Sequence, residues 1–146
     1  MLTVFRNCIA SFKMGMKLIS SLQFTPTVLI ATDGEGHLLF CNPITGVTIR
    51  IIQAHGNICY NVILGSDNLL TTGKDEVLRV WKFNKEKTNI NDLPIFERLL
   101  PGVKRLKGSN GFAITLTIPP IEKVGDSCIK QSFSVQVWDF ERTYNS

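Results

Sequence analysis

The sequence predicts an all-β protein, because short apolar runs alternate with turn-forming residues along most of its length. The runs are rich in Val, Ile, Leu, Phe and Thr and follow one another at intervals of roughly ten residues, which is typical of strands in an all-β fold. Helical periodicity is nearly absent. The predicted strands are Leu18–Phe24, Val28–Thr32, His37–Cys41, Val47–Ile52, Ile58–Leu64, Leu69–Thr72, Val77–Phe83, Ile95–Leu100, Val103–Leu106, Phe112–Ile118 and Phe133–Phe140, with Thr3–Phe12 as a candidate for one more.

Clusters of Gly, Pro, Asn and Asp separate these runs. In Asp33–Gly36 and Gly65–Asn68, Asp and Asn side chains close local turns and Gly adopts positive φ at low cost. Two longer polar segments, Asn84–Leu93 and Ile118–Gln131, are expected to be extra loop length between strands.

A repeat is visible once the strands are compared. Leu29–Cys41 and Leu69–Trp81 share an apolar strand, a polar turn with Gly and an acidic residue, and a second alternating strand, and their ends lie 40 positions apart. A third copy ends at Trp138, 57 positions after Trp81, so that copy carries additional residues. Repeats of about 40 residues with four short strands each are typical of propeller blades.

In detail, the chain resembles the WD-repeat β-propeller family. Asn42–His55 is similar to the turn, fourth strand and Gly-His ending of one repeat, with Ala54 in place of Gly. In that family a His, a Ser or Thr, an Asp and a Trp form a hydrogen-bonded tetrad. Such a network satisfies buried polar groups and locks strand order. The resemblance implies that the tetrad here consists of His55, Thr71, Asp75 and Trp81.

The tetrad is complete only in the middle repeat. The first repeat has Glu35 and Cys41 at the acid and Trp positions, and the last keeps Trp138 but has Ser132 at the acid position. Trp81 is followed by Lys82 where the family has Asp. We therefore expect the other repeats to be held by apolar packing.

An enzyme is the competing interpretation of the same residues. His55 and Asp75 suit a base and its orienting partner, with Ser66 or Ser109 as nucleophile. In serine hydrolases of the nucleophile-elbow type the catalytic serine lies in a Gly-x-Ser-x-Gly motif, which this sequence lacks. A structural histidine is favoured, and no catalytic residue is assigned.

The length of 146 residues fits one domain of about three four-stranded blades, a partial propeller. The approximate blades are 14–55, 56–101 and 102–146, with 1–13 as a possible ring-closing strand. Closed propellers have four to eight blades. The exposed lateral faces therefore suggest a part of a larger propeller, or a chain that pairs with itself or with another chain to complete a ring. The third alternative is a smaller, irregular β assembly that only shares the motif.

The resemblance implies a non-catalytic protein-interaction scaffold, a subunit of a larger complex that binds proteins or peptides. The expected interaction surface consists of Asn57, Lys74, Glu76 and Asn110. The alternative is an RNA-associated scaffold, for example in ribosome or mRNA processing. The net charge of +4 and possible phosphate contacts at Lys104, Arg105 and Lys107 favour it, although no aromatic residues are interleaved with them.

No metal or cofactor is expected. The four cysteines, Cys8, Cys41, Cys59 and Cys128, are far apart and form no zinc motif. Three of the four lie beside apolar strand-like residues and suit small buried side chains in a reducing compartment, so the cytoplasm or nucleus is the expected location. No apolar run is long enough for a membrane-spanning helix, and no membrane partner is expected.

Overall fold

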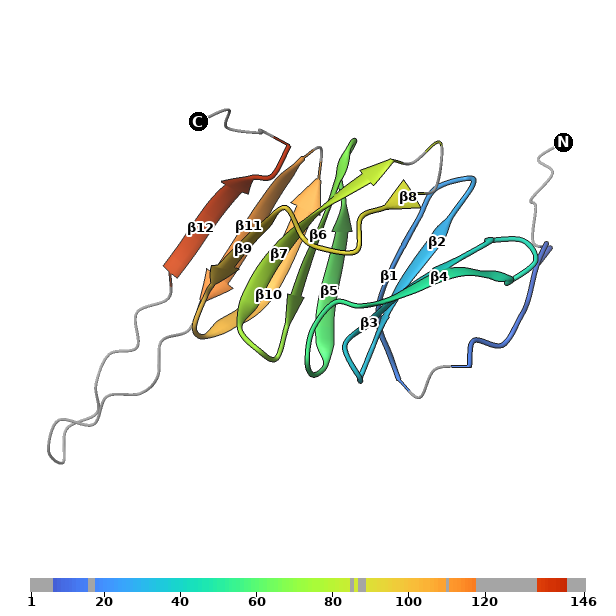
Figure 1. Cartoon of the computed structure of the whole chain (residues 1–146), viewed down its shortest axis with the longest axis horizontal. Coiled ribbons are helices and arrows are strands. Elements are labelled where there is room, and N and C mark those ends of the chain that lie inside the picture. The colour runs from blue at the N-terminus through green and yellow to red at the C-terminus, as the bar shows by residue number, and fades with distance from the viewer. Residues whose placement is uncertain are drawn as a thin grey trace, which may run out of the picture.

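A computed structural model describes residues 7–15, 18–84, 86, 89–109, 111–117 and 134–141. Within these residues the chain forms twelve strands and no helix, in three antiparallel sheets that stack side by side (Figure 1). The all-β prediction is confirmed. None of the described segments is a helix of the length and apolarity needed to cross a bilayer.

Sheet I contains the first four strands in sequential order. They are β1 (Ile19–Phe24), β2 (Leu29–Asp33), β3 (His37–Cys41) and β4 (Thr48–Gln53). The β2–β3 turn requires glycine at Gly36, whose φ is 88°. A Cβ there would lie 2.1 Å from the His55 carbonyl oxygen, so this turn packs tightly against the connection to the next sheet.

Sheet II is built around β7, which pairs with three other strands. Its strands are β5 (Cys59–Leu64), β6 (Asn68–Gly73), β7 (Val77–Asn84), β8 (Asn89–Ile90) and β9 (Phe96–Leu99). The outer edge of β7 is shared: β8 pairs with Phe83 and Asn84, and β9 pairs with residues 77–80. The loop expected over Asn84–Leu93 therefore contains one short strand.

Sheet III has three strands in the described part of the chain. They are β10 (Val103–Ser109), β11 (Phe112–Thr117) and β12 (Ser134–Asp139). The segment predicted as extra loop length, Ile118–Gln131, lies outside the described residues, as does Ser132.

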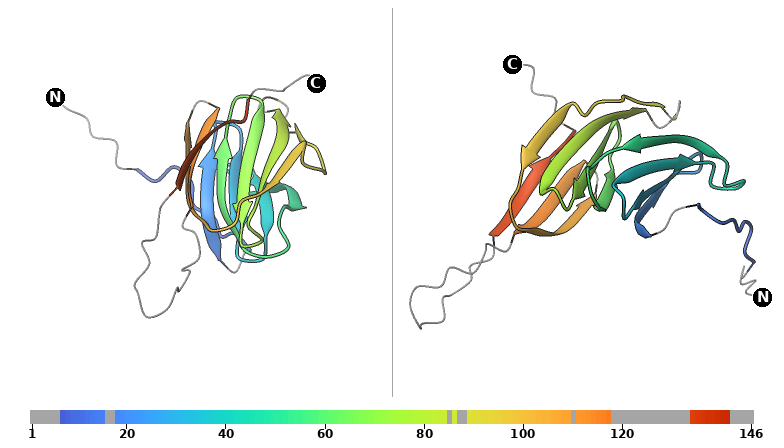
Figure 2. Two further views of the ribbon diagram at one scale, coloured as in Figure 1. Left: turned by 90° about the vertical axis from the view of Figure 1, so that its left-hand side faces the viewer. Right: turned by 60° about the horizontal axis from the view of Figure 1, so that its bottom comes forward.

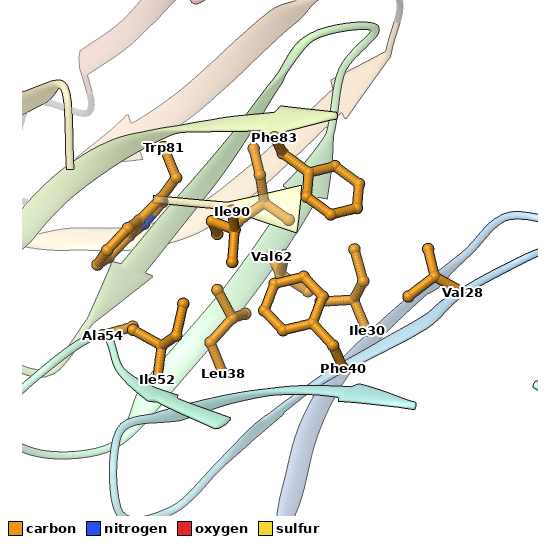
Figure 3. Packing of buried hydrophobic residues seen from close by; sticks show 11 residues of the cluster. Val28, Ile30, Leu38, Phe40, Ile52, Ala54, Val62, Trp81, Phe83 and Ile90 are labelled. Carbon is orange, nitrogen blue, oxygen red and sulfur yellow. The ribbon is translucent and has the colours of Figure 1, made fainter. Parts of the chain in front are cut away.

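Apolar side chains fill the space between sheets I and II (Figure 3). Phe40 of β3 and Phe83 of β7 stack with their ring centroids 5.6 Å apart. Around them lie side chains of both sheets, which are almost fully buried: Val28, Ile30, Leu38, Ile52, Ala54, Val62, Leu69, Trp81 and Ile90. Burial of aliphatic and aromatic surface is the main force that holds the two sheets together.

A second cluster joins sheets II and III. Its members are Ile63, Leu70, Leu78, Val80, Leu100, Leu106, Ala113 and Phe140, with Val103 and Trp138 at its edge. Polar contacts close one end of this interface, where Asn68 Nδ2 donates to the Phe140 carbonyl at 2.7 Å and Glu141 accepts from two backbone amides of the β5–β6 turn. Sheet III is thus fixed to sheet II by packing and by hydrogen bonds.

The first strands of the three sheets lie next to one another, β1 beside β5 and β5 beside β10. The sheets fan out from this inner side, as the second view in Figure 2 shows. Adjacent inner strands with sheets radiating from them are the arrangement of propeller blades.

Residues 7–15 form no strand in the structure and run along the outer side of sheet I (Figure 1). Met14 packs against Ala31, Leu39 and Cys41, and the Phe12 ring lies against Gly46. The strand expected over Thr3–Phe12 is therefore absent from residues 7–12, and residues 3–6 lie outside the described part. The blade boundaries and the ring-closing role of 1–13 stay predictions.

Candidate functional site

His55 lies in the connection between sheets I and II and is 2% exposed. Its position is set by sheet I, because the Gly36 carbonyl accepts hydrogen bonds from the backbone N–H groups of Ala54, at 2.9 Å, and His55, at 3.0 Å. The imidazole enters sheet II beside β6, where a Cβ at Gly73 would lie 2.7 Å from the ring. Glycine at that position leaves room for the ring.

The structure joins all four predicted tetrad side chains by hydrogen bonds. His55 Nδ1 lies 2.8 Å from Asp75 Oδ1, and His55 Nε2 lies 2.9 Å from Thr71 Oγ1. Trp81 Nε1 donates to the same Thr71 oxygen at 3.0 Å. The network connects the inter-sheet loop, β6, the β6–β7 turn and β7.

One proton arrangement satisfies the contacts of Trp81, Thr71, His55 and Asp75 in sequence. The Trp81 indole is a donor only, so the Thr71 hydroxyl accepts from it and donates its own hydrogen to His55 Nε2. The imidazole then carries its proton on Nδ1 and donates it to the Asp75 carboxylate. This tautomer is assigned from the pattern of partners.

Arg79 completes the network, and the sequence analysis did not single it out. Arg79 Nη1 lies 2.6 Å from Asp75 Oδ2 and 2.6 Å from His55 Nδ1. Because His55 Nδ1 carries a proton in the assigned tautomer, the Arg79 guanidinium donates to the Asp75 carboxylate. Its Nε donates to Glu97 of β9 at 2.7 Å. The missed signal is the strand alternation, which puts a charged residue on the same face as Trp81.

Burial and the nearby charges fix the ionisation of the network. Burial, reinforced by the Arg79 cation, lowers the pKa of His55 below its ordinary value of 6.5 despite the attraction of Asp75. Burial alone would raise the pKa of Asp75, but hydrogen bonds from Arg79 and His55 outweigh it and hold that pKa below the ordinary 3.8. The imidazole is neutral and the carboxylate is charged at neutral pH.

This arrangement gives His55 no free nitrogen with which to act as a base. Its ring is buried, and both nitrogens already have partners. Ser66, the nucleophile considered in the enzyme interpretation, lies in the turn at the opposite end of β5 and β6. The side chain of Ser109 lies outside the described residues. The geometry suits a structural network.

Sheet III repeats half of the network. Trp138 Nε1 donates to Thr115 Oγ1 at 3.0 Å. The register is the same in both sheets, because Trp81 lies opposite Leu69, two residues before Thr71, and Trp138 lies opposite Ala113, two residues before Thr115. The expectation that the last repeat relies on apolar packing is therefore incomplete.

In sheet I a carboxylate takes a different role. Asp33 Oδ1 accepts from the backbone N–H groups of Glu35, at 3.0 Å, and His37, at 2.7 Å, and Asp33 Oδ2 lies 2.9 Å from His37 Nδ1. The three side chains bring potential metal-ligand atoms within 4.8 Å of one another, but the hydrogen bonds of Asp33 are those of a closed turn. This is the turn expected over Asp33–Gly36.

Three of the four residues predicted for the interaction surface are described. Asn57, Lys74 and Glu76 are exposed and lie at the end of the sheets where the inter-sheet loop meets the β6–β7 turn. The two segments are joined by a hydrogen bond from Lys74 N to the Ile58 carbonyl, at 2.8 Å. Asn110 lies outside the described residues.

Of the predicted phosphate contacts, Lys107 is exposed on β10. Lys104 and Arg105 belong to the same strand, but their side chains are outside the described residues. Cys8, Cys41 and Cys59 are free thiols, of which Cys41 and Cys59 are buried and Cys8 is exposed. Cys128 lies outside the described part.

The backbone is similar to several solved structures. It superposes on the computationally designed protein Ika4 with a TM-score of 0.63 and 13% identity, over 92% of this chain and 73% of Ika4. The designed protein Ika8 gives a TM-score of 0.60 and 14% identity, over 91% of this chain and 36% of Ika8. The β-propeller domain of Cps50 (Swd1) from Myceliophteria thermophila gives 0.59 and 13%, over 84% of this chain and 40% of that domain.

The chain forms a partial β-propeller. Its three blades are sheets I, II and III, and the chain spans well under half the length of Ika8 and of the Cps50 domain. No protein-family model matches the chain, and the comparison with curated proteins gives no match. The structural likeness therefore shows the fold alone.

Proposed function

We propose that this chain is a non-catalytic protein-interaction scaffold of the WD-repeat type, acting as a subunit of a larger complex. The observation that carries the proposal is the position of Asn57, Lys74 and Glu76, which are exposed directly outside the buried His55 network. Binding residues are commonly found on loops that a rigid scaffold holds in place. Here the network supplies the rigid support.

Glu76 shows how firmly this surface is held. Its φ of 61° lies in the left-handed region, which a non-glycine residue adopts only where its surroundings enforce it. The Glu76 carbonyl accepts from Leu100 N at 2.7 Å, and its carboxylate accepts from Gly102 N at 3.2 Å. A surface that is ordered before binding loses less conformational entropy when a partner docks.

The chemistry of the surface favours a protein or peptide partner. It offers an ammonium, a carboxylate and an amide within one pair of adjoining loops, which suits a partner of mixed charge. Free thiols at Cys41 and Cys59 agree with a reducing compartment, so we place the chain in the cytoplasm or nucleus.

Charge reversal of this surface tests the proposal. The double variant Lys74→Glu, Glu76→Lys should lose at least tenfold in the recovery of partners captured quantitatively from cells, while circular dichroism shows that it is folded at the assay temperature. Lys82→Glu is the matched control, because Lys82 is exposed on β7 away from the Lys74 turn. Equal recovery by all three proteins would exclude this surface as the binding site.

The exposed Lys107 is the observation that favours the alternative, an RNA-associated scaffold. RNA binding depends on counterion release and weakens steeply with salt, by factors of about 10³–10⁵ between 50 and 200 mM for six to ten phosphate contacts. Binding of a protein partner at the Lys74 surface should change little over that range. Steep salt dependence together with sensitivity to Lys107→Gln would support RNA.

A further inference from the structure

The two ends of the stack carry no further sheet of the described chain, and at the sheet I end Met14 covers only the centre, at Ala31, Leu39 and Cys41. We call the side of a sheet that faces the preceding sheet its front and the side that faces the following sheet its back. The front of sheet II packs on the back of sheet I, and the front of sheet III packs on the back of sheet II. Within the described chain no sheet covers the front of sheet I or the back of sheet III (Figures 1 and 2).

The back of sheet III has the same apolar chemistry as the covered back of sheet II. The shared register of the two sheets makes three aliphatic positions equivalent: Leu70 and Ile114, Leu78 and Val135, Val80 and Val137. In sheet II these side chains are 0%, 1% and 6% exposed, because sheet III covers them. In sheet III their equivalents are 47%, 64% and 67% exposed.

The front of sheet I matches the covered front of sheet II in the same way. The 40-residue offset makes Leu22 and Phe24 of β1 equivalent to Val62 and Leu64 of β5, which belong to the packed interface of sheets I and II. Leu22 and Phe24 are 52% and 76% exposed. Together the exposed parts of these two faces correspond to the two complementary halves of the contact that the chain makes twice internally.

The N-terminal segment is compatible with a sheet at this position. Met14 precedes β1 by five residues, as Ala54 precedes β5 by five. Ala54 belongs to the interface of sheets I and II, and Met14 packs on the front of sheet I at the equivalent place. Met14 therefore forms part of the front face.

We propose that a second copy of this chain covers both faces, with the back of sheet III of each copy packed on the front of sheet I of the other. The contact pairs two different faces, so it must close by rotation or continue as a filament. Each copy contributes three sheets. Known closed propellers have four to eight blades, and two copies are the only number that gives a total in that range. The dimer is a closed ring of six sheets, and it does not depend on the Lys74 surface.

Lys107 is a charged residue on the back of sheet III at a position that is apolar on the back of sheet II. It lies opposite Ile114, on the back of sheet III, and corresponds to the buried Ile63 of sheet II. In the ring its aliphatic stem packs on the interface while its ammonium reaches for water, which weakens the contact. Lys107→Met should therefore strengthen dimerisation, whereas the same variant would weaken binding to RNA.

The association state tests the proposal. Sedimentation equilibrium of the purified chain over a wide concentration range should give a mass twice the 16.3 kDa of one chain. Val137→Lys and Leu22→Glu should each raise the dimer dissociation constant at least tenfold, because each damages both contacts of the ring. Leu93→Lys is the control, since Leu93 is 76% exposed in a loop away from both faces.

Mixing distinguishes this ring from other dimers. An equimolar mixture of Val137→Lys and Leu22→Glu restores one intact contact and brings a Lys opposite a Glu in the other, so the mixture should dimerise where each variant alone does not. A monomer at every concentration overturns the proposal. So does a dimer that Leu22→Glu leaves intact, which would be a symmetric contact between two copies of sheet III. Circular dichroism and melting of each variant at low concentration show that the monomer remains folded.

Discussion

Replacing Thr71 by valine is the sharpest test of the buried network. The hydroxyl is fully buried and serves two partners, Trp81 Nε1 at 3.0 Å and His55 Nε2 at 2.9 Å. Valine keeps the shape of the side chain, so the change removes hydrogen bonds with little change in packing. Each buried polar group that loses its partner costs about 1–3 kcal/mol. We expect the free energy of unfolding to fall by about 2–4 kcal/mol, a large part of the 5–15 kcal/mol typical of a domain.

Urea unfolding at one fixed protein concentration measures this loss. With a slope of about 1–3 kcal/mol per molar urea, the midpoint should fall by roughly 1–2 M. Thr71→Ser is the matched control, because serine keeps the hydroxyl and loses one methyl group, at a cost of about 1 kcal/mol. A valine variant as stable as the wild type, or more stable than the serine variant, would refute the assignment of a structural network.

Thr115→Val extends the same test to sheet III. There a single half-buried indole loses its acceptor, so the expected loss is about 1 kcal/mol, smaller than at Thr71. Hydrogen exchange of the two indole N–H groups gives an independent readout. Each valine variant should release the protection of its own tryptophan and leave the other protected.

Three further predictions follow from the structure. The pKa of His55 is lowered in the folded protein, so the free energy of unfolding should decline as the pH falls below about 6.5, the value in the unfolded chain. Urea midpoints measured at pH 7.5 and 5.5 should show a smaller decline for His55→Gln than for the wild type. A rise in stability on acidification would contradict the reasoning. Burial raises the pKa of Cys59 to about 12, so iodoacetamide at pH 8 should label Cys8 and reach Cys59 only in urea, as read by peptide mass mapping. Gly36→Ala places a Cβ 2.1 Å from a backbone oxygen at a position with positive φ, so it should lower the melting temperature sharply. Gly34→Ala is the control and should change the melting temperature little, because its Cβ would lie 3.3 Å from a leucine side chain.

The strands were largely predictable from the sequence because each carries enough apolar residues between turn-forming residues. The exception is β8, with two residues, Asn89 and Ile90. No pattern of alternation can appear in two residues, and the placement of β8 depends on a distant contact, in which Arg50 of sheet I donates to the Ile90 carbonyl at 2.6 Å. Tertiary contacts of this kind leave no local signal.

The tetrad positions could be predicted because the spacing of the middle repeat is regular. Thr115 was missed because the third repeat is interrupted: Thr115 follows Thr71 by 44 positions, whereas Trp138 follows Trp81 by 57. The extra residues between β11 and β12 hide the equivalence until the strands are paired. Arg79 was missed for another reason, since its role depends on partners in a turn and in β9 that a one-dimensional pattern does not bring together.

The divided outer edge of β7 has a practical consequence. Because β8 holds one end of that strand and β9 holds the other, residues 91–94 form a loop between them, and the next residue, Ile95, rejoins β7 through a hydrogen bond from its N–H to the Val80 carbonyl. Foreign peptides inserted beside Leu93 would be displayed on a short tether anchored at both ends. We therefore expect this exposed loop to accept an epitope or an affinity tag in the middle of the chain without unfolding of the host.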